Sequence, residues 1–138
     1  MKMDTLVTKS EAFRKINSKL VRVVQYKAGR DKKGYAVAMA RTYTRREVNV
    51  HRHLVPARDQ NKYVSSIRFL DKKLNVEVSC SCPDYVFAGW EWSNAQVGAS
   101  KIIYGNGEPP SLRNPGHRPG LCKHLIALRA LIKDKHGL

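Results

Sequence analysis

Two cysteines stand one residue apart in the stretch VSCSCPDY, residues 78–85, and a cysteine and a histidine repeat that spacing in LCKH, residues 121–124. The sequence therefore contains a Cys-x-Cys pair, Cys80 and Cys82, and a Cys-x-His pair, Cys122 and His124. Thiolate sulfur and imidazole nitrogen are donors that Zn²⁺ takes in a four-coordinate tetrahedral shell. Three sulfurs and one nitrogen complete that shell and leave no position open for a substrate. The four residues predict a structural zinc site.

The short spacing within each pair also limits the local structure. Residues two apart lie about 200° around a helix axis, so a pair converges on one ion only where regular structure begins or ends. Pro83 breaks the chain directly after Cys82. We expect Cys122 in the turn before a helix and His124 in its first turn, where the helix N-terminus favours the charge of a thiolate. Lys123 is positioned to offset the net charge of the zinc–thiolate centre.

Other ligands and other chemistries remain open for these residues. His51, His53 and His117 are alternative fourth ligands. A Cys–His pair could also act as nucleophile and base, but this requires a free thiolate and a third orienting group, and the zinc shell would consume both residues. The His-x-Glu and Pro-Cys-x-x-Cys pattern of the zinc deaminases is absent. We expect no enzymatic activity.

The number of cysteines has to be interpreted together with the cellular compartment. No early apolar run follows the first residues, and the longest apolar stretch near the end, residues 125–132, is interrupted by Arg129. We therefore expect neither a signal peptide nor a membrane span, and a cytoplasmic protein without a membrane partner. Thiols stay reduced in a cytosol, so three cysteines indicate metal ligands or a reactive thiol rather than disulfides.

The charge of the chain is large and unevenly distributed. The net charge is +15 over 138 residues. Residues 1–79 contain 19 Lys and Arg against 7 Asp and Glu, a net charge of +12, and residues 80–138 contribute the remaining +3. Such a field favours polyanions. Nucleic acid is the first candidate, DNA before RNA, and an acidic protein surface is the second. We expect no small-molecule substrate.

The stretch RTYTRR, residues 41–46, interleaves cations with an aromatic ring. With seven acids in this half, the cations cannot all be paired, so some must face solvent or a partner. The alternative is a solvated strand face whose arginines pair with neighbouring carboxylates. The residues that we expect to contact a nucleic acid backbone are Arg41, Tyr43, Arg45, Arg46 and Arg52, together with Lys32 and Lys33 in the preceding turn.

The apolar periodicity predicts an α+β fold in one domain, residues 1–138. A capping-box pattern at residues 8–11 predicts a short helix from about Lys9 to Lys19. Five strand-like runs predict an antiparallel meander of about five strands, at residues 20–27, 35–44, 48–55, 63–70 and 74–79. Helical periodicity returns in residues 121–135, where Leu121, Leu125, Leu128 and Ile132 form one apolar stripe that we expect to dock on the sheet.

The chain divides into two portions by composition. Residues 1–73 form a basic helix and sheet portion, and residues 74–135 form a zinc-binding portion with a long inserted loop, residues 89–120. Most of the prolines lie in this loop, and Trp90 and Trp92 stand at its start. A loop of this length is functional or contacts a partner. The two tryptophans either lie at a protein interface or pack under their own loop.

The pairs CSCPDY, residues 80–85, and CKHL, residues 122–125, resemble the SWIM-type zinc finger, whose pattern is Cys-x-Cys, a variable gap and Cys-x-His. The resemblance covers about residues 74–135. It implies a hairpin and a following helix that hold zinc through Cys80, Cys82, Cys122 and His124, in a protein that binds DNA or other proteins. The gap of 83–121 is longer than is usual in the family. A small basic member with a divergent N-terminal half is similar to bacteriophage-encoded examples.

Two classes of function follow. In the first, the protein is a zinc-stabilised module whose basic sheet contacts a nucleic acid backbone within a larger assembly. In the second, it is a structural or adaptor protein of a phage virion or another complex and acts through protein contacts. A basic virion component beside packaged DNA would satisfy both, and would lie in the host cytoplasm or in the virion.

Overall fold

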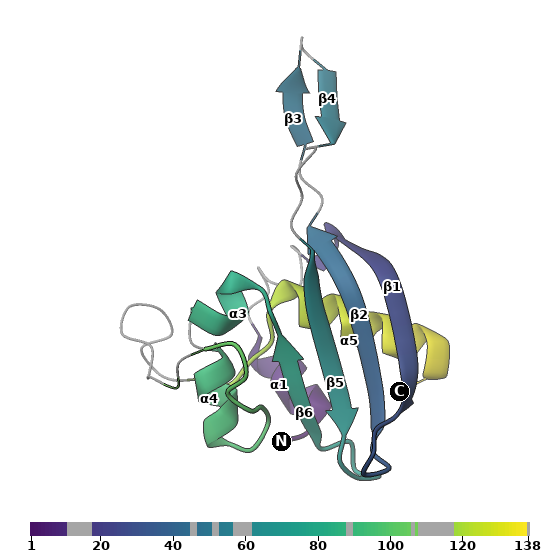
Figure 1. Ribbon diagram of the computed structural model, residues 1–138, viewed down its shortest axis with the longest axis vertical. Helices are drawn as coiled ribbons and strands as arrows, with labels where there is room; N and C mark the ends of the chain where they lie inside the picture. The colour runs from purple at the N-terminus through teal and green to yellow at the C-terminus, as the bar shows by residue number, and fades with distance from the viewer. Residues whose placement is uncertain are drawn as a thin grey trace.

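A computed structural model describes residues 1–10, 18–44, 47–50, 53–56, 62–87, 90–105, 107 and 118–137, without the side chains of 47–50 and 53–56. The elements in chain order are α1 (Met3–Lys9), β1 (Val21–Arg30), β2 (Ala36–Thr44), β3 (Glu47–Val50), β4 (His53–Pro56), β5 (Tyr63–Phe69), β6 (Val76–Cys80), α3 (Pro83–Phe87), α4 (Trp90–Gln96) and α5 (Lys123–His136) (Figure 1).

The predicted α+β class is confirmed, and the main sheet has four antiparallel strands in the order β1-β2-β5-β6 rather than five. The difference lies in residues 48–55, which were expected to form one strand of the meander. The chain reverses between Val50 and His53, and the two halves of this run pair with each other as β3 and β4. Because the backbone groups of β3 and β4 bond to each other, β2 of the main sheet pairs directly with β5. The hairpin projects beyond one end of the sheet (Figure 1).

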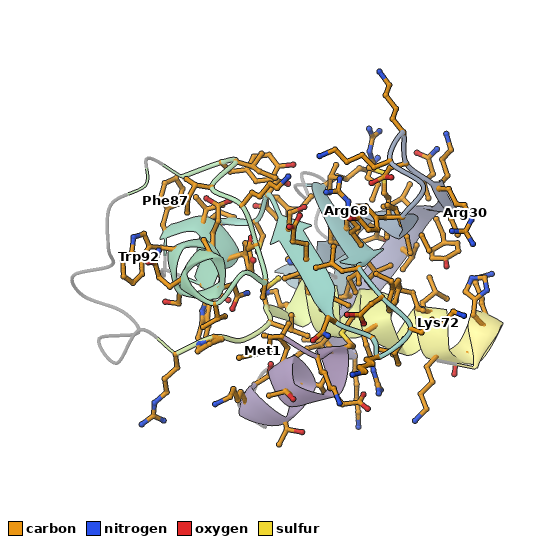
Figure 2. All side chains as sticks on the ribbon, turned by 90° about the horizontal axis from the view of Figure 1, so that it is seen from below. Met1, Arg30, Arg68, Lys72, Phe87 and Trp92 are labelled. Carbon is orange, nitrogen blue, oxygen red and sulfur yellow. The ribbon has the colours of Figure 1, made fainter. Side chains whose placement is uncertain are left out.

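Strand alternation gives the sheet one covered face. Ala38, Ala40 and Thr42 of β2 are buried, and so is Ile67 of β5. Helix α5 packs on this face (Figure 1), and the predicted stripe is confirmed because Leu121, Leu125, Leu128 and Ile132 are all buried. Figure 2 shows α1 and α5 on one side of the sheet and Arg68 on the other. Within the described ranges, neither α5 nor any other helix has the length and apolar character that crossing a lipid bilayer requires.

Helix α1 precedes the segment in which the capping pattern predicts a helix, from about Lys9 to Lys19. Thr8 lies inside α1, where its hydroxyl donates to the carbonyl oxygen of Asp4 at 2.8 Å. This local bond uses the hydroxyl within α1, so Thr8 does not cap a helix beginning at Lys9. Residues 11–17 of the predicted helix lie outside the described residues. The Ser10 hydroxyl accepts a hydrogen bond from the Leu121 amide at 3.1 Å, which fixes the end of α1 next to the start of α5.

The segment expected to be a loop, residues 89–120, contains helix α4 and folds back on itself. Glu91 is 1% exposed, and its carboxylate accepts hydrogen bonds from the amides of Tyr104 and Gly105 at 3.2 and 2.9 Å. Trp90 is buried against Gly120, where a Cβ atom would lie 2.7 Å from the ring. Of the two interpretations of the tryptophans, Trp90 therefore packs under its own segment, which the sequence composition alone did not decide.

Candidate metal centre

The four side chains predicted to bind zinc come together in the structure. The sulfur atoms of Cys80, Cys82 and Cys122 and a ring nitrogen of His124 all lie within 4.8 Å of one another. All four residues are buried, with at most 2% of their surface exposed. Sulfurs bound to one zinc ion at about 2.3 Å in a tetrahedron are roughly 3.8 Å apart. The four donors could therefore hold one metal ion with little movement.

The first pair sits where a strand passes into a helix. Cys80 is the last residue of β6, and Cys82 immediately precedes Pro83, the first residue of α3. The Cys82 sulfur accepts a hydrogen bond from the Tyr85 amide at 3.4 Å, and its carbonyl oxygen accepts one from the Val86 amide at 3.2 Å. Proline is favourable at this first helical position because its missing N–H has no partner there. The strand end and the helix start thus turn both sulfurs to the same side.

The second pair sits at the start of α5, as the sequence predicts. Cys122 is the N-cap residue, with an extended backbone at φ −77° and ψ 170°. Its carbonyl oxygen accepts the first helical hydrogen bond, from Ile126 at 3.0 Å. His124 follows in the first turn. This change of conformation between Cys122 and His124 directs both side chains toward the first pair, and the N-terminus of a 14-residue helix favours the charge of a thiolate.

The ring of His124 is oriented for metal binding. Its Nε2 lies 3.2 Å from the hydroxyl oxygen of Thr44, the last residue of β2. Its Nδ1 is buried and has no hydrogen-bond partner among the described residues. If Nε2 carries the proton and donates to Thr44, then Nδ1 keeps a lone pair available for a metal ion. The ring of Tyr63 packs beside the imidazole, with 5.3 Å between the ring centroids. A hydroxyl that accepts from the outer ring nitrogen in this way fixes the tautomer of a ligating histidine.

The electrostatics of the cluster also fit a cation. Hydrogen bonds with Cys122 and Cys80 lower the pKa of Cys82 far below its ordinary value. The hydrogen bond with Cys122 lowers the pKa of Cys80, but the bond with Cys82 and burial outweigh it and raise that pKa well above its ordinary value. Burial, followed by hydrogen bonds with Cys80 and Cys82, raises the pKa of Cys122. Without a cation the cluster therefore holds one thiolate and two thiols, and a divalent ion would stabilise all three as thiolates.

A buried network of polar side chains holds the backbone that leads into Cys122. The Asn94 side-chain amide donates to the carbonyl oxygen of Gly120 and accepts from the Gly120 amide, both at 2.8 Å. The same amide donates to the Tyr85 hydroxyl at 3.1 Å, which in turn donates to Ser100 at 3.0 Å. Asn94 of α4 thus holds the backbone of Gly120, two residues before Cys122. The ligand spacing gives no signal of this role for Asn94.

The structure brings together only part of the predicted nucleic-acid-binding set. Arg41 is exposed and Tyr43 half-buried, and both lie on the sheet face opposite α5. Lys32 and Lys33 are exposed in the β1–β2 turn, roughly 30 Å from Tyr43 along β2. Arg45, Arg46 and Arg52 lie outside the described residues. The same holds for His51 and His117 and for the side chain of His53, the alternative metal ligands.

Two cations of β1 share the face of Arg41 and Tyr43. Arg22 is directly opposite Tyr43 and Lys27 opposite Met39 in the β1–β2 register. The register shifts between Val23 and Gln25. This bulge places Arg22 and Lys27 on one face, although an odd spacing of five residues would put them on opposite faces of a regular strand. Strict alternation therefore misses this pair of cations. No carboxylate within the described ranges forms an ion pair with Arg22, Lys27 or Arg41.

Comparisons of the chain with protein-family models, with curated proteins and with solved structures give no match. The resemblance to the SWIM-type zinc finger therefore depends on the spacing of four residues, and the structure adds that these four residues form one cluster.

Proposed function

We propose that Cys80, Cys82, Cys122 and His124 bind one Zn²⁺ ion as a structural site of the SWIM type. The observation that carries this proposal is the convergence of four buried donors, with the Nδ1 atom of His124 lacking any other partner among the described residues. Three sulfurs and one nitrogen are a donor set suited to tetrahedral zinc. A complete protein shell leaves no coordination position for a substrate, so the centre stabilises the fold and does not itself catalyse a reaction.

The zinc-stabilised module binds a nucleic acid backbone, DNA more than RNA, within a larger assembly. Two features support this proposal. One is the net charge of +15, and the other is a sheet face that Arg22, Lys27 and Arg41 share with Tyr43, without carboxylate partners in the described part of the chain. Cations on a flat sheet contact phosphates and release counterions. A broad sheet face does not enter a DNA groove as a helix or a two-stranded ribbon does, so the binding is independent of base sequence.

The metal centre would also fix the end of β2, which precedes the β3–β4 hairpin in the sequence. His124 contacts Thr44, and Arg45 and Arg46 follow Thr44 directly in the sequence before β3 begins. In Figure 1 the hairpin projects from the end of the sheet at which α5 begins. Zinc binding therefore orients the strand from which these two arginines continue.

The dependence of DNA affinity on salt tests this function. We expect the affinity of the full chain for a duplex of arbitrary sequence to fall steeply with salt. Replacing Arg41, Arg45 and Arg46 by alanine should reduce the slope of log affinity against log salt by about 0.9 for each phosphate that is no longer neutralised. The matched control replaces Lys72, Lys73 and Lys133, which are exposed elsewhere. Equal slopes for the two triple variants, or affinity that does not depend on salt, would reject the proposal.

The second candidate function, a structural or adaptor subunit of a virion or another complex, is favoured by one separate observation. Strand β1 lies at the edge of the sheet, and an exposed strand edge is a common place for a protein partner to bind.

A further inference from the structure

The two edges of the main sheet differ. Along β6, the Val76 amide donates to the carbonyl oxygen of Met1 at 2.9 Å, and the Val78 amide donates to that of Ala99 at 2.7 Å. The N-terminus and the segment after α4 thus cover this edge. Strand β1 has ten residues and pairs with β2 on one side, and the described part of the chain provides no strand for its other side. Val23 and Val24 are 41% and 48% exposed there.

The backbone of β1 after the bulge is regular, so its outward groups can be identified. The Asp31 amide donates to the carbonyl oxygen of Tyr35 at 3.0 Å. Because hydrogen-bonded residues alternate in an antiparallel pair, Lys27 and Gly29 direct their backbone groups toward β2. Tyr26, Ala28 and Arg30 therefore direct their N–H and C=O groups outward. These three residues offer a partner strand a short ladder of donors and acceptors.

An apolar cavity of about 400 Å³ lies beside this ladder, on the face covered by α5. The same three residues of β1 line it, together with Ala36, Phe69 and Ile132. Small side chains at Ala28 and Ala36 leave the space open. His136, at the end of α5, closes one side through a 3.0 Å contact between its Nε2 and the Tyr26 hydroxyl. Figure 2 shows Arg30 at the edge of the sheet.

The charged side chains of β1 and of the residues just before it are all cationic. Residues 18–30 include Lys19, Arg22, Lys27 and Arg30 and no carboxylate. The Lys135 ammonium lies over the Tyr26 ring, 5.3 Å from its centroid. Pairing two copies of this edge would bring like charges together, which destabilises a strand pair. The edge is therefore complementary to an acidic segment and not to itself.

We propose that an extended acidic segment of another protein adds to β1 as a fifth strand of the sheet. Its backbone bonds to Tyr26, Ala28 and Arg30. Since side chains alternate along a strand, its apolar residues enter the cavity and its acidic residues lie on the opposite face beside Lys27. Backbone bonds supply affinity in this mode, and the cavity supplies selectivity for alternate side chains. This inference is independent of nucleic acid binding and names the chemistry of a protein partner.

Peptide binding to the full chain tests the inference. The probe is the acetylated, amidated heptapeptide EVEIEVE, labelled for fluorescence anisotropy. Two controls keep its charge: a form with methylated amides at alternate positions, which cannot form the ladder, and the rearranged sequence EEVIVEE, which breaks the alternation. We expect each control to bind at least about tenfold more weakly, because it loses backbone bonds or burial in the cavity. Equal binding of all three peptides would mean attraction by charge alone and would overturn the proposal.

Protein variants separate the ladder from the cavity. Ala28→Pro removes one outward N–H and leaves the bonds to β2 in place, since proline is tolerated on an edge. Ala36→Leu fills the cavity without changing the edge. We expect each to weaken EVEIEVE binding about tenfold or more, while Ala28→Ser and Ala36→Gly retain it. Circular dichroism establishes that each variant is folded. The methylated peptide tests the ladder on the unsubstituted chain, so that test does not depend on any variant folding.

Amide hydrogen exchange locates the added strand. With saturating EVEIEVE, exchange at Tyr26, Ala28 and Arg30 should slow, while Lys27 and Gly29, already bonded to β2, should change little. Slowing confined to other residues would overturn the proposal. Self-association of the chain through these same amides, without peptide, would also overturn it, because the partner would then be a second copy.

Discussion

His124 Nε2 lies 3.2 Å from the hydroxyl oxygen of Thr44, so a residue at the start of the last helix contacts a residue 80 positions earlier, at the end of β2. This contact connects the candidate metal centre to the main sheet. It also leaves Nδ1, which has no hydrogen-bond partner among the described residues, as the nitrogen available to a metal ion. A metal ion at this site would therefore hold together the end of β6, the start of α3, the start of α5 and, through Thr44, the end of β2.

Thr44→Val tests whether this hydroxyl supports metal binding. Valine keeps the shape of threonine but leaves the Nε2–H of His124 buried without an acceptor. We expect zinc affinity, measured by competition with a chelator, to fall about 10- to 100-fold, as is typical when a partner of a ligating histidine is removed. Thr44→Ser should retain most of the affinity. The matched control is Thr42→Val, on the same strand and face, where the hydroxyl contacts the carbonyl oxygen of Tyr63 at 3.4 Å. Equal losses for Val at both positions would contradict a specific role for Thr44.

Removal of a ligand should have a large effect on stability. We expect protein purified without added metal to contain about one zinc ion per chain. Cys80→Ser removes one of the four ligands, so the variant should lose the ion. It should also lose stability, because structural zinc contributes on the order of 10 kcal/mol to the folding of a small domain. Thermal unfolding followed by circular dichroism, with zinc content measured in parallel, checks both expectations. Ser79→Ala is the control, since Ser79 neighbours Cys80 but bonds to Ser66. A Cys80→Ser variant that still holds one zinc ion with unchanged unfolding would show that the site is not the one described.

Zinc binding should release protons. The pKa of Cys82 is lowered and those of Cys80 and Cys122 are raised, so at neutral pH, below both raised values, the metal-free cluster retains protons on two sulfurs. Binding should therefore release about two protons per ion, and affinity should fall about 100-fold for each unit that the pH is lowered. Calorimetry in buffers of different ionisation enthalpy measures the proton number. Release of no protons would mean that the three cysteines are already thiolates without metal.

The cations that share a face through the β1 bulge lead to a prediction about DNA. Arg22→Ala with Lys27→Ala should reduce the salt slope of DNA affinity by up to about 1.8, the value expected when two phosphates are no longer neutralised. The charge-matched control is Lys72→Ala with Lys73→Ala, in the turn between β5 and β6. The salt slopes of the two double variants are compared by measuring DNA affinity with fluorescence anisotropy over a series of salt concentrations. If both double variants give the same slope, the face opposite α5 does not contact the backbone.

The sequence predicts the parts of the centre that depend on local chemistry. Residue type and spacing identify Cys80 and His124, and the N-cap position of Cys122 follows from the start of helical periodicity. The fold class is also correct. The Val24 bulge could not be predicted, because it depends on how β1 pairs with β2 and not on β1 alone. The same applies to the β3–β4 hairpin, whose residues form strands as expected but pair with each other.

The contacts of helix α4 beside the candidate metal centre could not be predicted from the sequence either. Asn94 and Trp90 hold Gly120 through contacts between residues 26 and 30 positions apart, and composition indicated only a long loop there. Tertiary contacts of this kind override local propensity and leave no periodic pattern in the sequence.

Gly120→Ala tests whether this packing supports the metal centre. A Cβ atom at Gly120 would lie 2.7 Å from Cζ3 of the Trp90 ring, and the ring is itself buried, so either the ring or the backbone before Cys122 must move. We expect a loss of about 1–3 kcal/mol in the free energy of unfolding, as for other overpacked sites, together with weaker zinc binding because the moved backbone leads into Cys122. Gly29→Ala is the control: a Cβ there has no atom within 4 Å, and Gly29 is far from the centre in β1. Denaturant unfolding with and without zinc separates the two effects. If Gly120→Ala lowers stability equally in both conditions, the packing of Trp90 supports the fold but does not position the ligand.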